Sequence, residues 1–70
     1  MEDGKLLYII AKNIKKYRKM NNMTQEALAN ASNLAVRHIQ KIESATLNIT
    51  VSTLNKISSA LNISPSDLLK

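Results

Sequence analysis

The segment from Met23 to Glu43, MTQEALANASNLAVRHIQKIE, decides the fold because it has the pattern of two short helices joined by a tight turn. Thr24 is the predicted N-cap of the first helix, and Glu26 follows in the first turn, where a negative charge favours the helix dipole. Asn33 tolerates a positive φ and predicts the turn. A second amphipathic helix begins at Ala35. Two such helices at a steep angle form a helix-turn-helix, whose second helix fits the major groove of DNA.

Two short motifs within this segment connect it to a known family. The first helix opens with Thr24-Gln25-Glu26 and the second closes with Ile39-Gln40-Lys41-Ile42-Glu43. Both resemble motifs of the phage repressor and Cro family of helix-turn-helix domains. The resemblance extends to residues 14–18 upstream and to residues 54–69 downstream, and so covers nearly the whole chain. It implies a lambda-repressor-like DNA-binding domain over residues 1–70, with the helix-turn-helix at about residues 24–43.

Apolar periodicity predicts three more helices, and no strand pattern or repeat interrupts them. The first covers about Lys5–Met20 and the fourth about Val51–Leu61, with Thr50 as N-cap. A short last helix follows Ser64, which caps it. The predicted fold class is therefore all-α, a compact bundle of five helices. The inner face of the fourth helix is predicted to comprise Val51, Leu54, Ile57, Ser58 and Leu61.

Length and composition limit the classes of protein that need consideration. Seventy residues without cysteine are expected to form one domain that is stabilised by apolar packing, with no thiolate metal site. No apolar run approaches the length of a membrane span and no basic leader is present, so we expect a cytoplasmic protein that has no membrane partner. No cofactor and no small-molecule ligand is expected.

The net charge of +5 is concentrated in one half of the chain. Between Lys5 and Lys41 there are eight basic residues and a single acidic residue, Glu26, whereas from Ile42 onward two basic residues are balanced by two acidic ones. Such asymmetry indicates a face that binds a polyanion, or simply lysine-rich helices that keep the protein in solution. The coincidence with the helix-turn-helix favours nucleic acid.

The predicted base contacts lie near the start of the second helix. Arg37 can donate two hydrogen bonds to guanine, Val36 can contact a thymine methyl group, and Lys41 can reach guanine or a phosphate. The family resemblance assigns base contacts to the same three positions. The alternative is that all three are ordinary exposed helix residues.

Contacts with the DNA backbone are expected from polar positions near the ends of the two helices. Gln25 is placed to bind a phosphate together with free backbone N–H groups, whereas Ala35 lacks the hydroxyl that the family often has there. His38 has no Cys, second His or acidic cluster beside it, so we predict an exposed residue near phosphate and no metal site. The predicted backbone-contact positions are Thr24, Gln25, Ala35, His38, Gln40, Ser44, Thr46 and Asn48.

Other positions are assigned to architecture and assembly. The family resemblance implies a partly buried ion pair between Arg18 and Glu43. The family commonly has glycine at four turn positions, which here hold Asn22, Asn33, Ala45 and Asn62; the asparagines should keep the bends, and the loop at Ala45 is where a difference is expected. The apolar Leu6, Tyr8 and Ile9 lie partly off the stripe of the first helix and either cap the end of the domain or contribute to a dimer contact. A dimer interface is expected at Ile63, Leu68 and Leu69.

The leading hypothesis is a transcriptional regulator that binds double-stranded DNA as a homodimer on an inverted repeat. Its small size resembles Cro-like regulators and the controller proteins of restriction-modification systems, and the segments Ser32-Asn33-Leu34 and Asn48-Ile49-Thr50 favour the controllers. The alternative is an antitoxin-like protein-interaction module whose DNA binding is secondary. An enzyme is not expected, because the sequence has no nucleophile-base pair, metal cluster or phosphate loop.

Overall fold

The structure is a computed structural model that describes residues 3–70, and in that range it contains four α-helices and one short 3-10 helix. The elements are α1 (Asp3–Met20), α2 (Gln25–Ser32), α3 (Val36–Glu43), α4 (Val51–Ala60) and η1 (Pro65–Leu69). The all-α class is confirmed, but the prediction of five α-helices is wrong. The last element is only five residues long and closes with a bond from the Asp67 N–H to the Ser64 carbonyl, an i to i+3 bond that belongs to a 3-10 turn.

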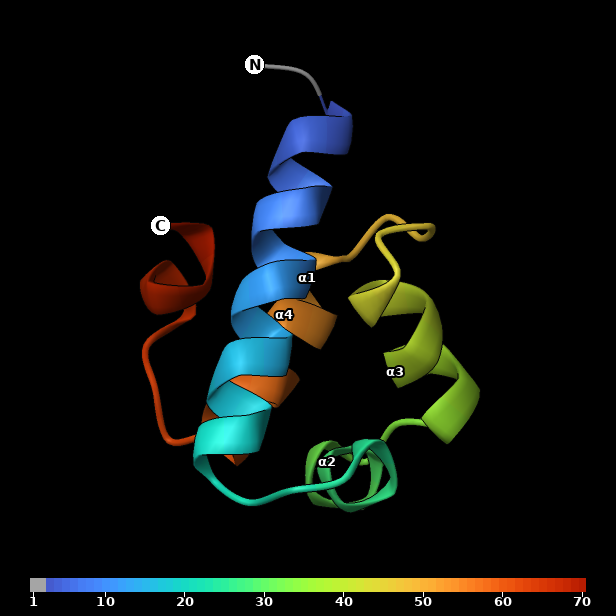
Figure 1. The fold of residues 1–70 in the computed structure, drawn as a ribbon, viewed down its shortest axis with the longest axis vertical. Coiled ribbons are helices and arrows are strands. Elements are labelled where there is room, and N and C mark those ends of the chain that lie inside the picture. The colour runs from blue at the N-terminus through green and yellow to red at the C-terminus, as the bar shows by residue number, and fades with distance from the viewer. Residues whose placement is uncertain (1–2) are drawn as a thin grey trace.

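The longest helix, α1, organises the arrangement of the others (Figure 1). It packs against η1 on one side and α3 on the other, while α2 packs against both α3 and α4. The molecule measures 31 × 22 × 20 Å. No helix within residues 3–70 has both the length and the apolar character required to cross a membrane.

Side-chain caps begin two of the α-helices as predicted. The Thr24 hydroxyl accepts a hydrogen bond from the Ala27 N–H at the start of α2 (2.9 Å), and the Thr50 hydroxyl accepts one from the Thr53 N–H at the start of α4 (3.1 Å). The N-cap of α3 is Ala35, which has no side-chain bond to offer. Thus α3 begins without a capping bond of the kind that usually stabilises a helix by about 1 kcal/mol.

All four α-helices end in the same way, on a residue in the left-handed conformation. The φ angles are 56° at Asn22, 58° at Asn33, 60° at Ala45 and 59° at Asn62. After each helix the residue with positive φ and the next residue donate to carbonyls of the last turn, which is the Schellman pattern. Ala45 adopts the same angle as the three asparagines, so the difference expected at that turn is not found in its backbone conformation.

The hydrophobic core joins all five elements. Its buried members come from the four α-helices, from the residue that follows α4 and from η1. They are Ile10, Ile14, Leu28, Ala29, Ile39, Ile42, Ile57, Leu61 and Leu68. Val51 does not lie on the inner face of α4, since it is 83% exposed. It occupies the first residue of the helix, and Thr53 is buried there instead.

Leu68 corrects the predicted dimer interface. Its side chain is fully buried in the core, and its carbonyl accepts a hydrogen bond of 2.9 Å from the Asn13 side chain of α1. A residue in that position holds η1 against α1 and has no surface to offer a partner. The prediction that Leu68 contacts a second subunit is therefore wrong.

Candidate nucleic-acid interface

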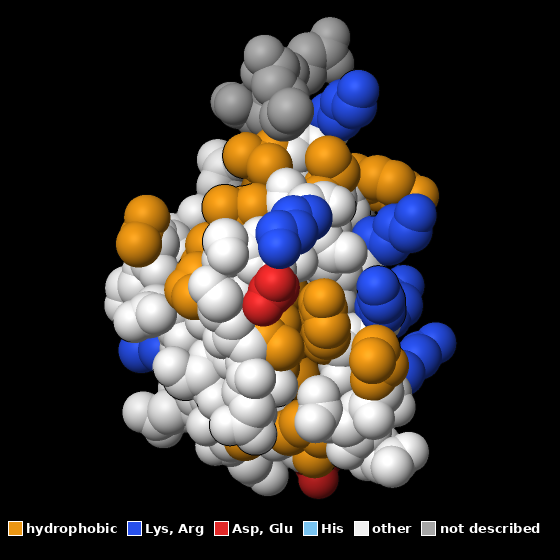
Figure 2. All heavy atoms as spheres, turned by 90° about the vertical axis from the view of Figure 1, so that its left-hand side faces the viewer, with side chains coloured by type: hydrophobic (Ala, Val, Ile, Leu, Met, Phe, Trp, Pro, Cys, Tyr) orange, Lys and Arg blue, Asp and Glu red, His pale blue; other side chains and the backbone are white. Residues whose placement is uncertain are grey.

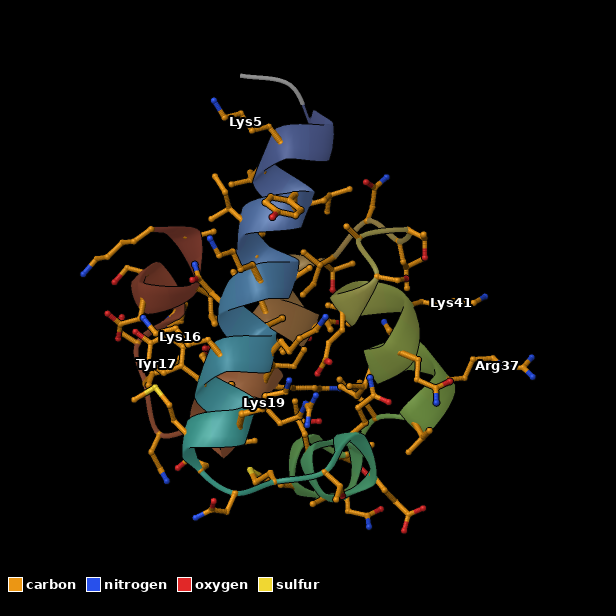
Figure 3. The ribbon with its side chains drawn as sticks, viewed as in Figure 1. Lys5, Lys16, Tyr17, Lys19, Arg37 and Lys41 are labelled. Carbon is orange, nitrogen blue, oxygen red and sulfur yellow. The ribbon has the colours of Figure 1, made fainter. Side chains whose placement is uncertain are left out.

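The two sides of α3 differ sharply in character. Ile39, Ile42 and Glu43 are buried toward the core, whereas Arg37 and Lys41 are exposed. Because Arg37 and Lys41 are four residues apart, they lie on one side of the helix, and both side chains extend away from the rest of the molecule (Figure 3). The helix thus holds two cationic side chains outward from a fixed base.

The orientation of α3 is fixed by an ion pair with α1. Arg18 binds Glu43 through two contacts, Nε to Oε2 at 2.7 Å and Nη2 to Oε1 at 3.0 Å. Arg18 Nη1 also donates to the Met23 carbonyl at 2.8 Å. The two charged side chains are only 11% and 3% exposed. Such paired geometry matches the planar guanidinium to the carboxylate and defines one arrangement of the two helices.

Gln25 connects α2 to the same carboxylate. Its side-chain amide donates to Glu43 Oε1 at 3.2 Å. Gln25 is half-buried and is the first residue of α2, where the backbone N–H groups of the first turn have no partner within the helix. Glu43 therefore holds side chains from α1 and α2 beside the end of α3.

Two hydroxyl groups end α3 on its solvent side. Ser44 Oγ and Thr46 Oγ1 each lie within hydrogen-bond distance of the Lys41 carbonyl, at 2.9 and 3.2 Å, and the two oxygens are 2.8 Å apart. Each hydroxyl has one proton, so one of them can donate to this carbonyl while the other hydroxyl stays free to donate elsewhere. The pair is chemically able to donate one hydrogen bond to an outside oxygen.

The remaining predicted DNA-contact residues differ in accessibility. Val36 is half-buried and packs against the core, so only part of its side chain is available to a base. His38 is half-buried, and the side chains 4–70 contain no group of three residues that could hold a metal ion. Six positions are exposed, namely Thr24, Ala35, Gln40, Ser44, Thr46 and Asn48.

The predicted assembly residues also separate. Ile63 is half-buried against the core, and Leu69 is 45% exposed. Leu69 lines an apolar groove of about 430 Å³ together with Leu6 from α1 and Val51 from α4. Of the extra apolar residues on α1, Tyr8 is 60% exposed, Leu6 packs against the core and Ile9 is half-buried.

The sequence predicted a polyanion-binding face, but it did not predict a groove that places the lysines of α1 beside α3. Lysines of α1 line a groove whose other wall is the end of α3, at Glu43 and Ser44. Helical periodicity alone places these lysines on the solvent-exposed side of α1. Their spacing of three and four residues indicates that they share one side of the helix, but only the packing of α1 on α3 shows that this side borders α3.

Comparison with known proteins agrees with this geometry. The Helix-turn-helix family matches residues 14–68. The chain is 43% identical over 61 residues to control protein C.SmaI of Serratia marcescens. This alignment covers 87% of this chain and 73% of that protein. Solved structures with a similar fold include two controller proteins. The restriction-modification controller protein C.AhdI from Aeromonas hydrophila has a TM-score of 0.86 and 26% identity, over 89% of this chain and 94% of that one. The controller protein C.Esp1396I has a TM-score of 0.82 and 41% identity, over 84% and 77%.

Proposed function

The chain belongs to the Helix-turn-helix family, and on this basis we propose that it is a sequence-specific DNA-binding transcriptional regulator of the restriction-modification controller type. It acts as a homodimer on an inverted-repeat operator in double-stranded DNA. The relatives described above are named as control and controller proteins, which supports this proposal over the antitoxin-like alternative.

The outward position of Arg37 and Lys41 on α3 carries the proposal. When α3 lies in the major groove, Arg37 near its start reaches base edges and donates two hydrogen bonds to guanine O6 and N7. Lys41, one turn further, contacts guanine or the adjacent phosphate. Val36 presents its accessible part to a thymine methyl group.

The backbone contacts proposed for this complex surround α3. Gln25 and the first turn of α2 bind one phosphate, and Gln25 is held for this by its bond to Glu43. One hydroxyl of the Ser44 and Thr46 pair donates a hydrogen bond to a second phosphate. These groups are neutral, so they position the protein without adding to the salt dependence of binding.

The test uses duplexes that the purified protein selects from random-sequence DNA. We expect Arg37→Ala to weaken binding to the selected site by about 5- to 150-fold, since a bidentate guanine contact contributes about 1–3 kcal/mol of discrimination. Preference at one G·C pair should be lost at the same time. Lys56→Ala is the matched control, because Lys56 is an exposed cation on α4. An Arg37→Ala variant that kept both the affinity and the same preferred sequence would exclude Arg37 as a base reader.

A further inference from the structure

A groove of about 400 Å³ runs between α1 and the C-terminal end of α3. One wall consists of the solvent side of α1, and the other consists of the last residue of α3 and the loop after it. In Figure 2 blue Lys and Arg side chains gather along the right-hand edge of the molecule, which is the side that faces the viewer in Figure 1. The lining residues that matter here are Lys12, Lys15, Lys16, Lys19, Glu43 and Ser44.

The charge of this groove is strongly positive. Among the side chains 4–70, the ion pairs are Arg18–Glu43 and Lys70–Asp67, neither of which involves a lysine of the groove. The single carboxylate in its lining, Glu43, is already bound by Arg18 and is 3% exposed. The groove therefore presents lysines to solvent with their charges uncompensated by the walls around them.

One of the four lysines, Lys16, already contacts an aromatic ring. Lys16 Nζ lies 5.3 Å from the centre of the Tyr17 ring, in a cation–π arrangement. Figure 3 shows Lys16 and Tyr17 together on the side of α1 away from α3. Lys12, Lys15 and Lys19 are the remaining lysines of the groove.

The spacing of these lysines suits a phosphate backbone. Lys12 and Lys19 are seven residues apart, which corresponds to about 10 Å along a helix. One strand of B-DNA carries a phosphate about every 3.4 Å of helix axis, so lysines spread over this length can each reach a phosphate of the same strand. A stripe of three lysines over that distance is complementary in charge and in scale to one short run of DNA backbone.

We propose that this groove binds the phosphate backbone of DNA outside the base pairs that α3 reads. The inference rests on the proposed function, because a duplex held by α3 brings its own backbone to the wall that α3 and the groove share. An acidic protein surface has suitable charge too. The continuity of the groove with the end of α3 favours DNA.

The experiment compares two triple variants of equal net charge. Lys12→Gln, Lys15→Gln and Lys19→Gln together remove the groove lysines. Lys5→Gln, Lys56→Gln and Lys70→Gln remove three exposed lysines that do not line the groove. Each protein is titrated with a short duplex that contains only the selected site, and with a duplex about 10 bp, one helical turn, longer at each end. Affinity is measured between 50 and 200 mM salt.

On the long duplex, we expect the groove variant to lose about three phosphate contacts, which lowers the slope of log K against log salt by about 2.7. The ratio of the affinity of the unmodified protein to that of the groove variant should then fall about 40-fold from 50 to 200 mM salt. On the short duplex the two triple variants should behave alike. The control variant should keep the slope of the unmodified protein on both duplexes.

Two results would overturn the inference. Equal salt slopes for both triple variants on the long duplex would mean that the groove touches no DNA. Equal losses by the groove variant on both duplexes would mean that its lysines act only through the general field of the protein. Failure of the proposed function is distinguishable, because the unmodified protein would then select no preferred site at all.

Discussion

At the residue scale, Glu43 connects three helices through its side chain. Its carboxylate accepts hydrogen bonds from Arg18 on α1 and from Gln25 on α2, and Arg18 also binds the Met23 carbonyl between these helices. A buried charge pair of this kind adds little net stability compared with apolar residues, but breaking it leaves one charge buried and alone. The consequence of losing Glu43 is therefore much larger than the consequence of losing an exposed acid.

We expect Glu43→Ala to lower the free energy of unfolding by about 3–5 kcal/mol, because Arg18 keeps its charge at 11% exposure with no carboxylate to bind. Chemical denaturation measures this loss. Glu26→Ala is the matched control: Glu26 is exposed in the first turn of α2, and its removal should lower the stability by about 0.5 kcal/mol. Replacing both partners, with Arg18→Met and Glu43→Leu, should recover much of the stability. A single variant as stable as the control would contradict this account of the pair.

At the element scale, the ends of the helices are the most uniform feature of the fold. Each α-helix closes on a left-handed residue, and none of these residues is a glycine. Asparagine reaches this conformation at modest energy, whereas alanine has no side-chain polar group that compensates for it. The end of α3 at Ala45 is therefore the strained one of the four.

Ala45→Gly should stabilise the protein by about 0.5–1 kcal/mol. Glycine removes the left-handed strain of about 1–2 kcal/mol at φ 60°, and the greater freedom of glycine in the unfolded chain takes back part of the gain. Ala31→Gly is the control: residue 31 lies exposed within α2, and the same substitution should destabilise there by about 1 kcal/mol. Thermal midpoints of the two variants that shift in the same direction would contradict the assignment of strain to Ala45.

Local signals were enough to predict most element boundaries. Thr24 and Thr50 are caps whose hydroxyls need only the next turn of their own helix, and the asparagines at the turns respond to backbone geometry alone. The resemblance to the phage repressor family supplied the partnership of Arg18 and Glu43, which no periodicity contains. The exposed position of Arg37 also followed from helical spacing around Ile39.

Features that depend on packing between distant segments were not predictable from the sequence. Val51 has the spacing of an inner residue, but it is the first residue of α4 and is exposed, whereas Thr53 of the same turn is buried. Leu68 and Leu69 are adjacent and chemically identical, and only the contact of η1 with α1 decides that Leu68 is the buried one. The groove between α1 and α3 has the same origin.

At the scale of the whole molecule, the lysine-lined groove and the apolar groove are formed by different residues. Blue side chains gather along one edge of the molecule in Figure 2, and Arg37 and Lys41 extend from the outer side of α3 in Figure 3. The apolar groove lies between the first half of α1, the start of α4 and Leu69. This separation lets one surface bind DNA while another supports the proposed homodimer, in which Leu69 and Ile63 are the remaining contact residues.

Leu69→Glu should convert the proposed dimer into a monomer, because it buries a charge in the contact between the two copies. Light scattering measures the change in mass. The thermal midpoint of the unmodified protein should also rise with protein concentration, and that of the variant should not. Met20→Glu is the control, since Met20 is 66% exposed at the opposite end of α1 and should leave the dimer intact. A monomeric unmodified protein at micromolar concentration, or a dimeric Leu69→Glu variant, would exclude this interface.

The bonds around Glu43 have one more consequence, which concerns the duplex. Because Glu43 bonds α3 to both α1 and α2, α3 has little freedom to tilt or shift when it contacts a DNA groove of unfavourable shape. If α3 binds the major groove as proposed, the DNA has to adapt instead, and we expect sites with easily bent or compressed steps to be preferred even at base pairs that no side chain contacts.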